Sequence, residues 1–261
     1  MEYRRGNQLY LKSDLIEKCG GVKHCFTSRL GGVSQGKICG LNLGFRVDDN
    51  PKSVKENYHI VAEDIGLNLE NMVLAKQTHT DNIRMVTRED AGKGITKISD
   101  IEDTDGLLTN EKGIALVVFA ADCVPILLYD SKRGVAGAIH AGWRGTVKGI
   151  AGKAVEMMKT EYGSNPEDIV VSVGPSIGPC CFEFGMDAED YFPTEYIKVV
   201  SDEKRLVDIW SMNKEQLLSR GIREENIDLL GVCTVCNSDK FYSYRTHREN
   251  TGRQTAIIEI I

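Results

Sequence analysis

The chain has 261 residues, of which 41% are hydrophobic and 27% are charged, as is usual for a soluble globular protein. Its net charge of -6 argues against nucleic-acid binding, because attraction to a phosphate backbone depends on a basic surface. The first residues lack the apolar core of a signal peptide, and no apolar run approaches the roughly 20 residues that span a bilayer. We therefore expect a cytoplasmic protein that does not enter a membrane. The lack of linkers and repeats predicts a single domain over residues 1–261.

The first half of the chain contains glycine-rich turns, a helix and a strand. Glycines punctuate residues 28–45, which predicts tight turns there. Residues 51–66 predict a helix, because Pro51 stands at its start, apolar residues recur on one face and Gly66 follows its end. Residues 71–86 alternate in polarity and predict a strand with His79 near its centre.

The second half begins with apolar strands. Residues 113–123 form one apolar run, and 124–130 and 134–140 predict a hairpin that turns at 131–134. Residues 141–163 predict a glycine-rich entry into a helix of about four turns, and 169–184 a strand followed by a Gly/Pro-rich loop. We expect helices near 185–193 and 212–220 and strands at 228–235 and 254–260. This alternation favours a mixed α/β sandwich with its helices outside the strands.

Three side chains could form a metal site. In the predicted hairpin Cys123 and His140 are about equally distant from the turn, so we expect them to lie nearly opposite each other, about 5 Å apart. His79 supplies a third ligand. Three Cys/His ligands with an open fourth position are typical of catalytic zinc, which lowers the pKa of bound water to about 7. A cysteine and a histidine in buried strands can equally be packing residues, or a nucleophile and its base.

The residues after His140 predict an anion site. Gly142 and Gly145 precede a helix, whose free N–H groups favour an anion, and Arg144 could add a bidentate contact to phosphate or carboxylate. The same glycines would also serve a tight strand-to-helix turn, and the two interpretations are about equally supported.

Longer motifs identify a family. The segments ADCVPILLYD and AIHAGWRGT, with QTHTDNI and DTDGLLT before them and VGPSIGPCCFE after them, resemble the YfiH/laccase-domain family. The segments FTSRLGGVS, LNLGFRVDDNP and FYSYRTHRENTGRQTAII extend the resemblance over nearly the whole chain. The resemblance implies a four-layer α/β/β/α sandwich, a mixed α+β fold shared with a cysteine-dependent deamidating toxin. It also implies a zinc site made of His79, Cys123 and His140.

The resemblance further implies activity on purine nucleosides: phosphorolysis of adenosine, inosine and methylthioadenosine, and deamination of adenosine, by a monomer or homodimer. The laccase name implies copper, which outcompetes zinc at most nitrogen and sulfur ligand sets. However, multicopper oxidases need many histidines in His-x-His pairs, and this chain has five histidines and no such pair. We therefore expect zinc, with copper only as an adventitious occupant.

Other residues are candidates for catalysis and substrate binding. Asp122 adjoins Cys123 and could move protons during deamination, or instead orient a metal ligand. Arg46 and Arg144 could hold phosphate. Asn42 could bind ribose or base, although a turn residue is the simpler interpretation, and Cys181 could line the pocket. Tyr244, Arg245 and Arg253 could also line the pocket, although structural or surface roles are the simpler interpretation.

The pairs Cys180-Cys181 and Cys233-x-x-Cys236 invite a redox or second zinc interpretation. We expect neither, because neighbouring cysteines need further partners to hold one tetrahedral ion and Cys-x-x-Cys is half of a zinc ribbon. Two other functions remain open for the whole chain. It could be a cysteine hydrolase or amidase that uses Cys123 and His140, for example in the editing of peptidoglycan precursors, or it could be a metal-binding protein without enzymatic activity.

Overall fold

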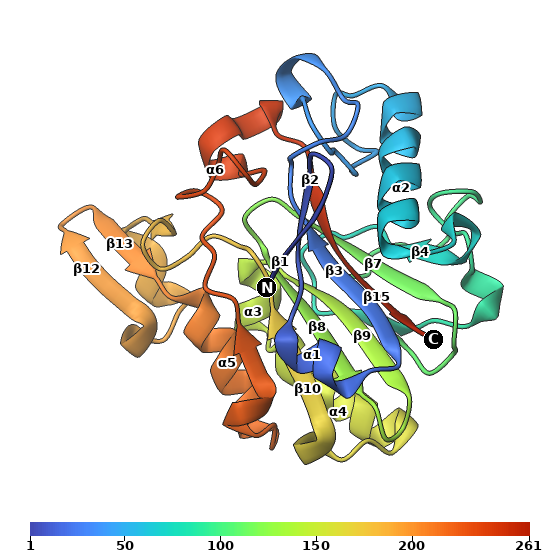
Figure 1. Ribbon diagram of the computed structural model, residues 1–261. Helices are drawn as coiled ribbons and strands as arrows, with labels where there is room; N and C mark the ends of the chain where they lie inside the picture. The colour runs from blue at the N-terminus through green and yellow to red at the C-terminus, as the bar shows by residue number, and fades with distance from the viewer.

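The computed structural model describes residues 1–261 and contains two six-stranded sheets that pack face to face (Figure 1). The strand order of the first sheet is β1-β2-β3-β15-β7-β4. Its strands are β1 (Glu2–Arg5), β2 (Gln8–Leu11), β3 (Val22–Thr27), β15 (Gln254–Ile260), β7 (Ala115–Ala120) and β4 (Met72–Leu74). β4 and β7 run parallel, so their C-terminal ends lie side by side at the same end of the sheet.

The second sheet has the order β14-β10-β8-β9-β6-β5. Its strands are β14 (Ile227–Leu229), β10 (Ile169–Val173), β8 (Val124–Asp130), β9 (Val135–Ala141), β6 (Gly106–Thr109) and β5 (Ile83–Met85). Every residue of β8 and β9 is buried, because this central hairpin has protein on both faces.

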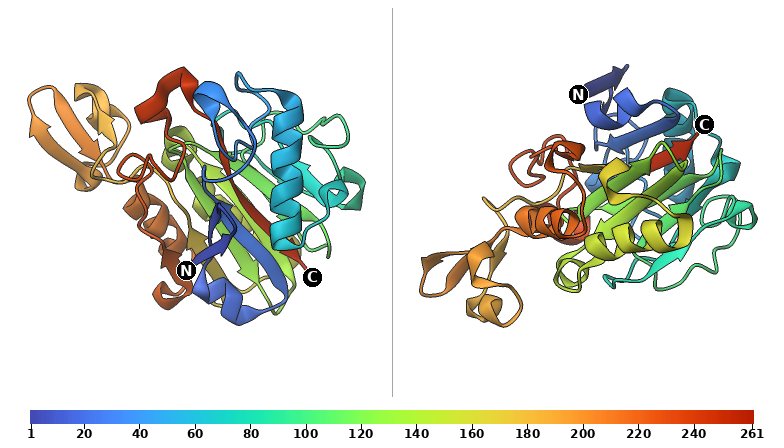
Figure 2. Two further views of the ribbon diagram at one scale, coloured as in Figure 1. Left: turned by 45° about the horizontal axis from the view of Figure 1, so that its top comes forward. Right: turned by 90° about the horizontal axis from the view of Figure 1, so that it is seen from below.

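Three buried clusters show what lies on each side of the sheets. One holds the two sheets together and includes Leu116 and Val118 of β7 and Leu127 and Tyr129 of β8. The next residues along β8, Ile126 and Leu128, belong to a second cluster with the helices α4 (Ile150–Tyr162) and α5 (Ile209–Ser219). A third cluster packs α2 (Pro51–Ile65) against the outer face of the first sheet. The alternation of side chains along each strand thus separates the layers, and the result is a mixed α+β fold consistent with the predicted α/β/β/α order (Figure 2).

Helix α2 agrees with its prediction. The Asn50 side chain accepts a hydrogen bond from the backbone N–H of Lys52 at the start of the helix, and Gly66 ends it in the left-handed conformation with φ 75°. Its buried residues Val54, Tyr58 and Val61 follow the predicted face and lie against the sheet.

The hairpin was predicted correctly, but the pairing of Cys123 with His140 was wrong. The turn occupies residues 131–134, and the Asp130 carboxylate accepts hydrogen bonds from the N–H groups of Lys132 and Arg133. In this register His140 lies opposite Pro125. Cys123 lies one residue before β8 and outside the paired register, but its sulfur is still within 4.8 Å of a ring nitrogen of His140.

Some predicted elements differ in the structure. The single strand expected over residues 71–86 is two short strands, β4 and β5, which belong to different sheets, and His79 lies in the loop between them. The helix of about four turns expected within residues 141–163 is present as α4, and its glycine-rich entry additionally forms a short helix, α3 (Trp143–Val147), which is separated from α4 at Gly149, with φ 83°. Residues 185–193 contain only a short 3-10 helix, and the strand expected at 228–235 is β14, which ends at Leu229.

The remaining elements lie at the margins. A small sheet of β11 (Glu183–Phe184), β13 (Lys204–Val207) and β12 (Ile197–Ser201) projects away from the two main sheets (Figure 2). Helix α1 (Asp14–Cys19) connects β2 and β3, and α6 (Tyr244–His247) precedes β15. None of the helices combines the length and the apolar character needed to cross a membrane.

Candidate metal centre and active site

His79, Cys123 and His140 come together where β4, β7 and β9 end. The Cys123 sulfur lies 3.7 Å from Nε2 of His79, and one ligand atom from each of the three residues lies within 4.8 Å of the others. His140 is buried in β9, Cys123 immediately precedes β8, and His79 is exposed in its loop. The site is therefore anchored on one side and accessible on the other.

Asp105 organises this group, although we did not select it from the sequence. Its carboxylate accepts hydrogen bonds from the N–H groups of Thr78, His79 and Thr80. These bonds hold the loop at His79, whose φ of 65° is unusual for a residue other than glycine. The only signal in the sequence was the position of Asp105 in the DTDGLLT motif, directly before β6.

The same carboxylate also orients His140. Oδ1 of Asp105 lies 2.6 Å from Nδ1 of His140, and both side chains are buried. When Nδ1–H donates to the carboxylate, Nε2 is directed toward Cys123 and His79. Burial alone would raise the pKa of Asp105, but the hydrogen bond and charge of His140 outweigh it and lower this pKa to about 2.

The electrostatic environment favours a thiolate at Cys123. Burial would raise its pKa, but the charge of His140 and hydrogen bonds from His140 and His79 lower it to about 6. Burial would also lower the pKa of His140, and here the charges and hydrogen bonds of Cys123 and Asp105 raise it. Ionised sulfur is the form required of both a metal ligand and a nucleophile.

The donor set fits a metal such as zinc. One thiolate and two imidazoles are usual zinc ligands, and three protein ligands leave a fourth position open. Gly142 provides part of the space, because a Cβ atom at this position would lie 2.7 Å from Cδ2 of His79 and 3.4 Å from the Cys123 sulfur. A side chain at residue 142 would therefore displace the ligands.

A cavity of about 500 Å³ opens beside these three residues. This volume lies in the range typical of small-molecule sites. Two kinds of side chain on its wall are relevant to a nucleoside and phosphate. The aromatic ones are Phe45, Phe119, Trp143, Phe182 and Tyr244, and the cationic ones are Arg46, Lys76, Arg245 and Arg253.

Asp122 lines the cavity, but hydrogen bonds occupy both of its carboxylate oxygens. Oδ1 accepts from the Thr234 hydroxyl at 2.7 Å, and Oδ2 accepts from the N–H of Arg245 at 2.6 Å. Its backbone carbonyl accepts from the N–H of Ile177. Asp122 thus joins three segments of the wall beside Cys123, in a backbone conformation with φ 91°.

Of the four residues predicted to bind substrate, only Arg46 lines the cavity. Asn42 is fully buried, and its Oδ1 accepts hydrogen bonds from the N–H groups of Gly44 and Arg253, as expected of a turn residue. Arg144 is exposed and stacks on Trp143, with its guanidinium carbon 4.3 Å from the ring centroid. Cys181 lies among other cysteines.

The C-terminal segment contributes more to the cavity than we expected. Tyr244, Arg245 and Arg253 all line it, whereas the sequence favoured structural or surface roles for them. The Arg253 guanidinium also donates hydrogen bonds to the carbonyls of Thr251 and Gly252, which fix its position. These residues reach the cavity only because the C-terminal segment folds back onto it, and the local sequence pattern does not reveal this contact.

Comparison with known proteins now places the chain. Residues 23–261 match the model of the family described as multi-copper polyphenol oxidoreductase laccase. The chain belongs to this family. Purine nucleoside phosphorylase YlmD of Bacillus subtilis is 35% identical over 240 residues, which cover 89% of this chain and 86% of that protein. The family description names copper chemistry, whereas this relative is named for purine nucleosides.

Two solved structures of the family share the fold. YlmD from Geobacillus stearothermophilus has a TM-score of 0.92 at 33% identity, covering 99% of this chain and 98% of its own. The hypothetical protein YfiH of Bacillus licheniformis has a TM-score of 0.91 at 32% identity, covering 98% of this chain and 97% of its own. These structures confirm the predicted fold family.

Proposed function

We propose that this protein is a zinc-dependent purine nucleoside phosphorylase that also deaminates adenosine. The observation that carries the proposal is the open three-ligand donor set of His79, Cys123 and His140 beside a cavity with both cationic and aromatic walls. The name of the Bacillus subtilis relative supports the choice of substrate class.

The cationic and the aromatic residues of the cavity wall would bind different parts of the substrates. Arg46, Arg245 and Arg253 present guanidinium groups, which bind phosphate through short charge-assisted hydrogen bonds. Aromatic rings such as Trp143 and Phe119 offer flat apolar surface to a purine base. Phosphorolysis needs both at once, because a phosphate oxygen forms a bond to the anomeric carbon of the ribose while the bond from that carbon to the purine nitrogen breaks. The purine leaves with a proton, and ribose 1-phosphate remains.

A zinc ion held by His79, Cys123 and His140 would supply Lewis-acid chemistry to this reaction and to deamination. Asp105 keeps His140 in the tautomer that presents Nε2, and it keeps His79 at the site through the loop backbone. Asp122 holds the wall around Cys123. Because both of its carboxylate oxygens accept hydrogen bonds, we assign it an organising role before a proton-transfer role.

The decisive experiment combines metal analysis with product analysis. Purified protein is incubated with adenosine, inosine or methylthioadenosine, with and without phosphate. We expect free base only when phosphate is present, inosine from adenosine with or without phosphate, and about one zinc ion at this site. Metal-replete protein that forms neither product contradicts the proposal. The same preparation, run on a sizing column, separates monomer from homodimer.

A second candidate function is favoured by one observation. Cys123, His140 and Asp105 follow one another as thiolate, imidazole and orienting carboxylate, which is also the arrangement of a cysteine hydrolase. A thiolate bound to zinc is a poor nucleophile. Metal-free protein that is alkylated rapidly at Cys123 and cleaves amides would favour the hydrolase, whereas loss of all activity on metal removal favours the phosphorylase.

A further inference from the structure

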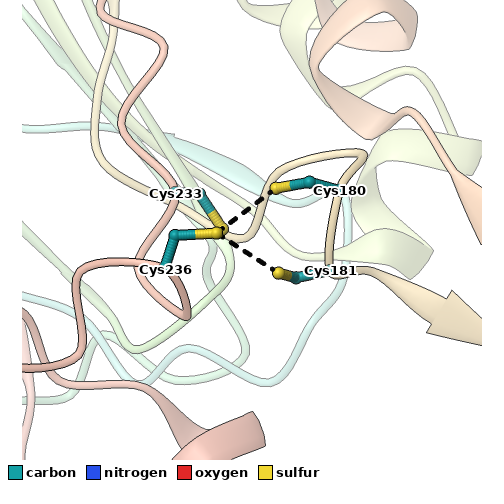
Figure 3. A group of neighbouring side chains, drawn as sticks. All are labelled: Cys180, Cys181, Cys233 and Cys236. Carbon is teal, nitrogen blue, oxygen red and sulfur yellow. Dashed lines mark hydrogen bonds between the residues drawn. The ribbon is translucent and has the colours of Figure 1, made fainter.

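Four cysteines that the nucleoside site does not use form a second cluster. Cys180 and Cys181 follow the turn after β10, and Cys233 and Cys236 lie in the loop after β14. The two pairs are separated by about 50 residues of sequence, but Figure 3 shows all four side chains converging on one point. All four sulfur atoms lie within 4.8 Å of one another. Each pair therefore supplies the partners whose absence led us to discount a metal site.

The spacing of the sulfur atoms fits a tetrahedral ion. Zinc–sulfur bonds of about 2.3 Å place the ligands of a tetrahedral site about 3.8 Å apart. The Cys236 sulfur lies 3.6 Å from that of Cys180 and 3.5 Å from that of Cys181. A disulfide needs a separation of about 2 Å between one chosen pair, and here Cys236 has two nearly equidistant neighbours. A shared ion uses every sulfur without choosing between them.

The backbone around the cluster is ordered by hydrogen bonds. Ser176 and Cys233 form a parallel bridge, in which the N–H of Ser176 donates to Val232 and the N–H of Thr234 donates to Ser176. The N–H of Gly178 also donates to the Cys233 sulfur at 3.3 Å. The loop geometry that brings the two pairs together is thus fixed by the protein itself.

Backbone N–H groups surround the Cys233 sulfur. Those of Gly178, Val235 and Cys236 donate to it. Several N–H donors directed at the first cysteine of a Cys-x-x-Cys segment suit a sulfur that serves as a metal ligand.

We propose that Cys180, Cys181, Cys233 and Cys236 bind a second zinc ion, whose role is structural. Four thiolates fill a tetrahedral shell and leave no position for a substrate. The ion would clamp the segment after β10 to the segment after β14. Both segments reach the catalytic cavity, because Ile177 and Phe182 line its wall and Thr234 donates to Asp122. The clamp would therefore keep the wall of the cavity in place without taking part in the chemistry.

Metal content tests this proposal separately from the nucleoside reaction. The chain is purified without air and analysed as wild type, as Cys123→Ser and as the double variant Cys181→Ser/Cys236→Ser, with Cys39→Ser as the control for an exposed cysteine outside both clusters. We expect about two zinc ions in the wild type and the control, and about one in each of the other two. Equal zinc in the wild type and the double variant overturns the proposal.

Cobalt gives a readout that needs no variant of the cluster. Cobalt(II) added to metal-free Cys123→Ser protein should give the intense thiolate-to-metal absorption of a four-sulfur site, because the other site then has no thiolate. Absence of this absorption contradicts the proposal even if the double variant fails to fold. A cluster that is instead a disulfide would show a mass lower by two hydrogens, reversed by reductant, in protein kept from air, and this result also overturns it. None of these readouts depends on nucleoside activity, so the two proposals fail independently.

Discussion

The two ligand clusters of this protein differ in every property that decides what a metal does. His79, Cys123 and His140 offer two nitrogens and one sulfur beside a cavity of about 500 Å³, and the buried Asp105 carboxylate orients two of the three. The four cysteines offer only sulfur, lie in two loops and have backbone N–H groups as their support. Three ligands with a carboxylate behind them suit an ion that must bind substrate, and four thiolates suit an ion that must stay in place. Under the two proposals, the cluster of His79, Cys123 and His140 would hold a reactive ion and the four cysteines would hold a structural one.

Of the changes that test this difference between the clusters, the removal of Cys123 should have the largest effect on activity. Cys123→Ala takes away the only thiolate of the open site, and loss of Lewis-acid stabilisation worth several kcal/mol corresponds to about a thousandfold lower kcat/KM. Phosphorolysis should fall by that amount and one zinc ion should be lost, while the four-cysteine cluster keeps its metal. The measurement is steady-state kinetics with metal analysis, and Cys39→Ser is the matched control. Full activity in Cys123→Ala would show that the cavity works without this ligand.

Asp105→Asn comes next, because it changes no ligand and tests the support behind them. Replacing a carboxylate that orients a metal-bound histidine costs about 10–100-fold in metal affinity or activity. An amide also loses the charge that stabilises His140, and it no longer accepts at both oxygens from the loop of His79. Zinc affinity by competition with a chelator is the direct measurement. The control is Asp168→Asn, which alters only an ion pair with Lys132 at the surface. Equal zinc affinity in the two variants would show that Asp105 does not support the metal ligands.

Two buried histidines have opposite surroundings, and the third test concerns the one that lies outside the metal site. His140 faces a carboxylate and a thiolate, whereas His24 is buried in β3 and accepts a hydrogen bond from the N–H of Ser13. Burial lowers the pKa of His24 to about 4, despite the opposing charge of Glu17. The unfolded chain, with a pKa near 6.5, then binds the proton more readily than the folded one. His24 therefore contributes full stability above pH 6.5, and this contribution is lost as the pH falls toward 4.

Between pH 7 and pH 5 this loss should be about 2 kcal/mol in the free energy of unfolding. Urea denaturation at both pH values measures it, in the wild type and in His24→Gln. The variant should lack this part of the pH dependence, while His59→Gln, at an exposed position of α2, should keep it. A pH dependence identical in all three chains would show that the folded protein accommodates the charged imidazole of His24.

How much of this was visible in the sequence depends on how local each feature is. Helix α2 and the hairpin of β8 and β9 carry their own caps, turn and apolar patterns, so their positions could be predicted. Features that depend on distant parts of the chain were predicted wrongly. The alternating pattern around His79 hides a crossover between sheets, because alternation does not tell which sheet a strand joins.

The candidate site shows the same limit. His79, Cys123 and His140 were found from residue type, strand ends and family motifs, and the structure brings them together. Asp105 and the approach of Cys180-Cys181 to Cys233-x-x-Cys236 were missed, because both depend on pairing between distant segments. A Cys-x-x-Cys segment is informative only when its partner is known, and the partner is supplied by the bridge between Ser176 and Cys233.

The smallest expected effect separates two arginines that the sequence treated alike. Arg46 lines the cavity, whereas the exposed Arg144 stacks on the ring of Trp143 and does not line it. Loss of one charge-assisted hydrogen bond to phosphate costs about 1.5 kcal/mol, so Arg46→Gln should raise the KM for phosphate about tenfold and change the KM for the nucleoside little. Arg144→Gln should leave both constants near their wild-type values. If Arg144→Gln alone weakens phosphate binding, the anion lies at the start of α3, as the glycines there first indicated, and the cationic wall of the cavity has another purpose.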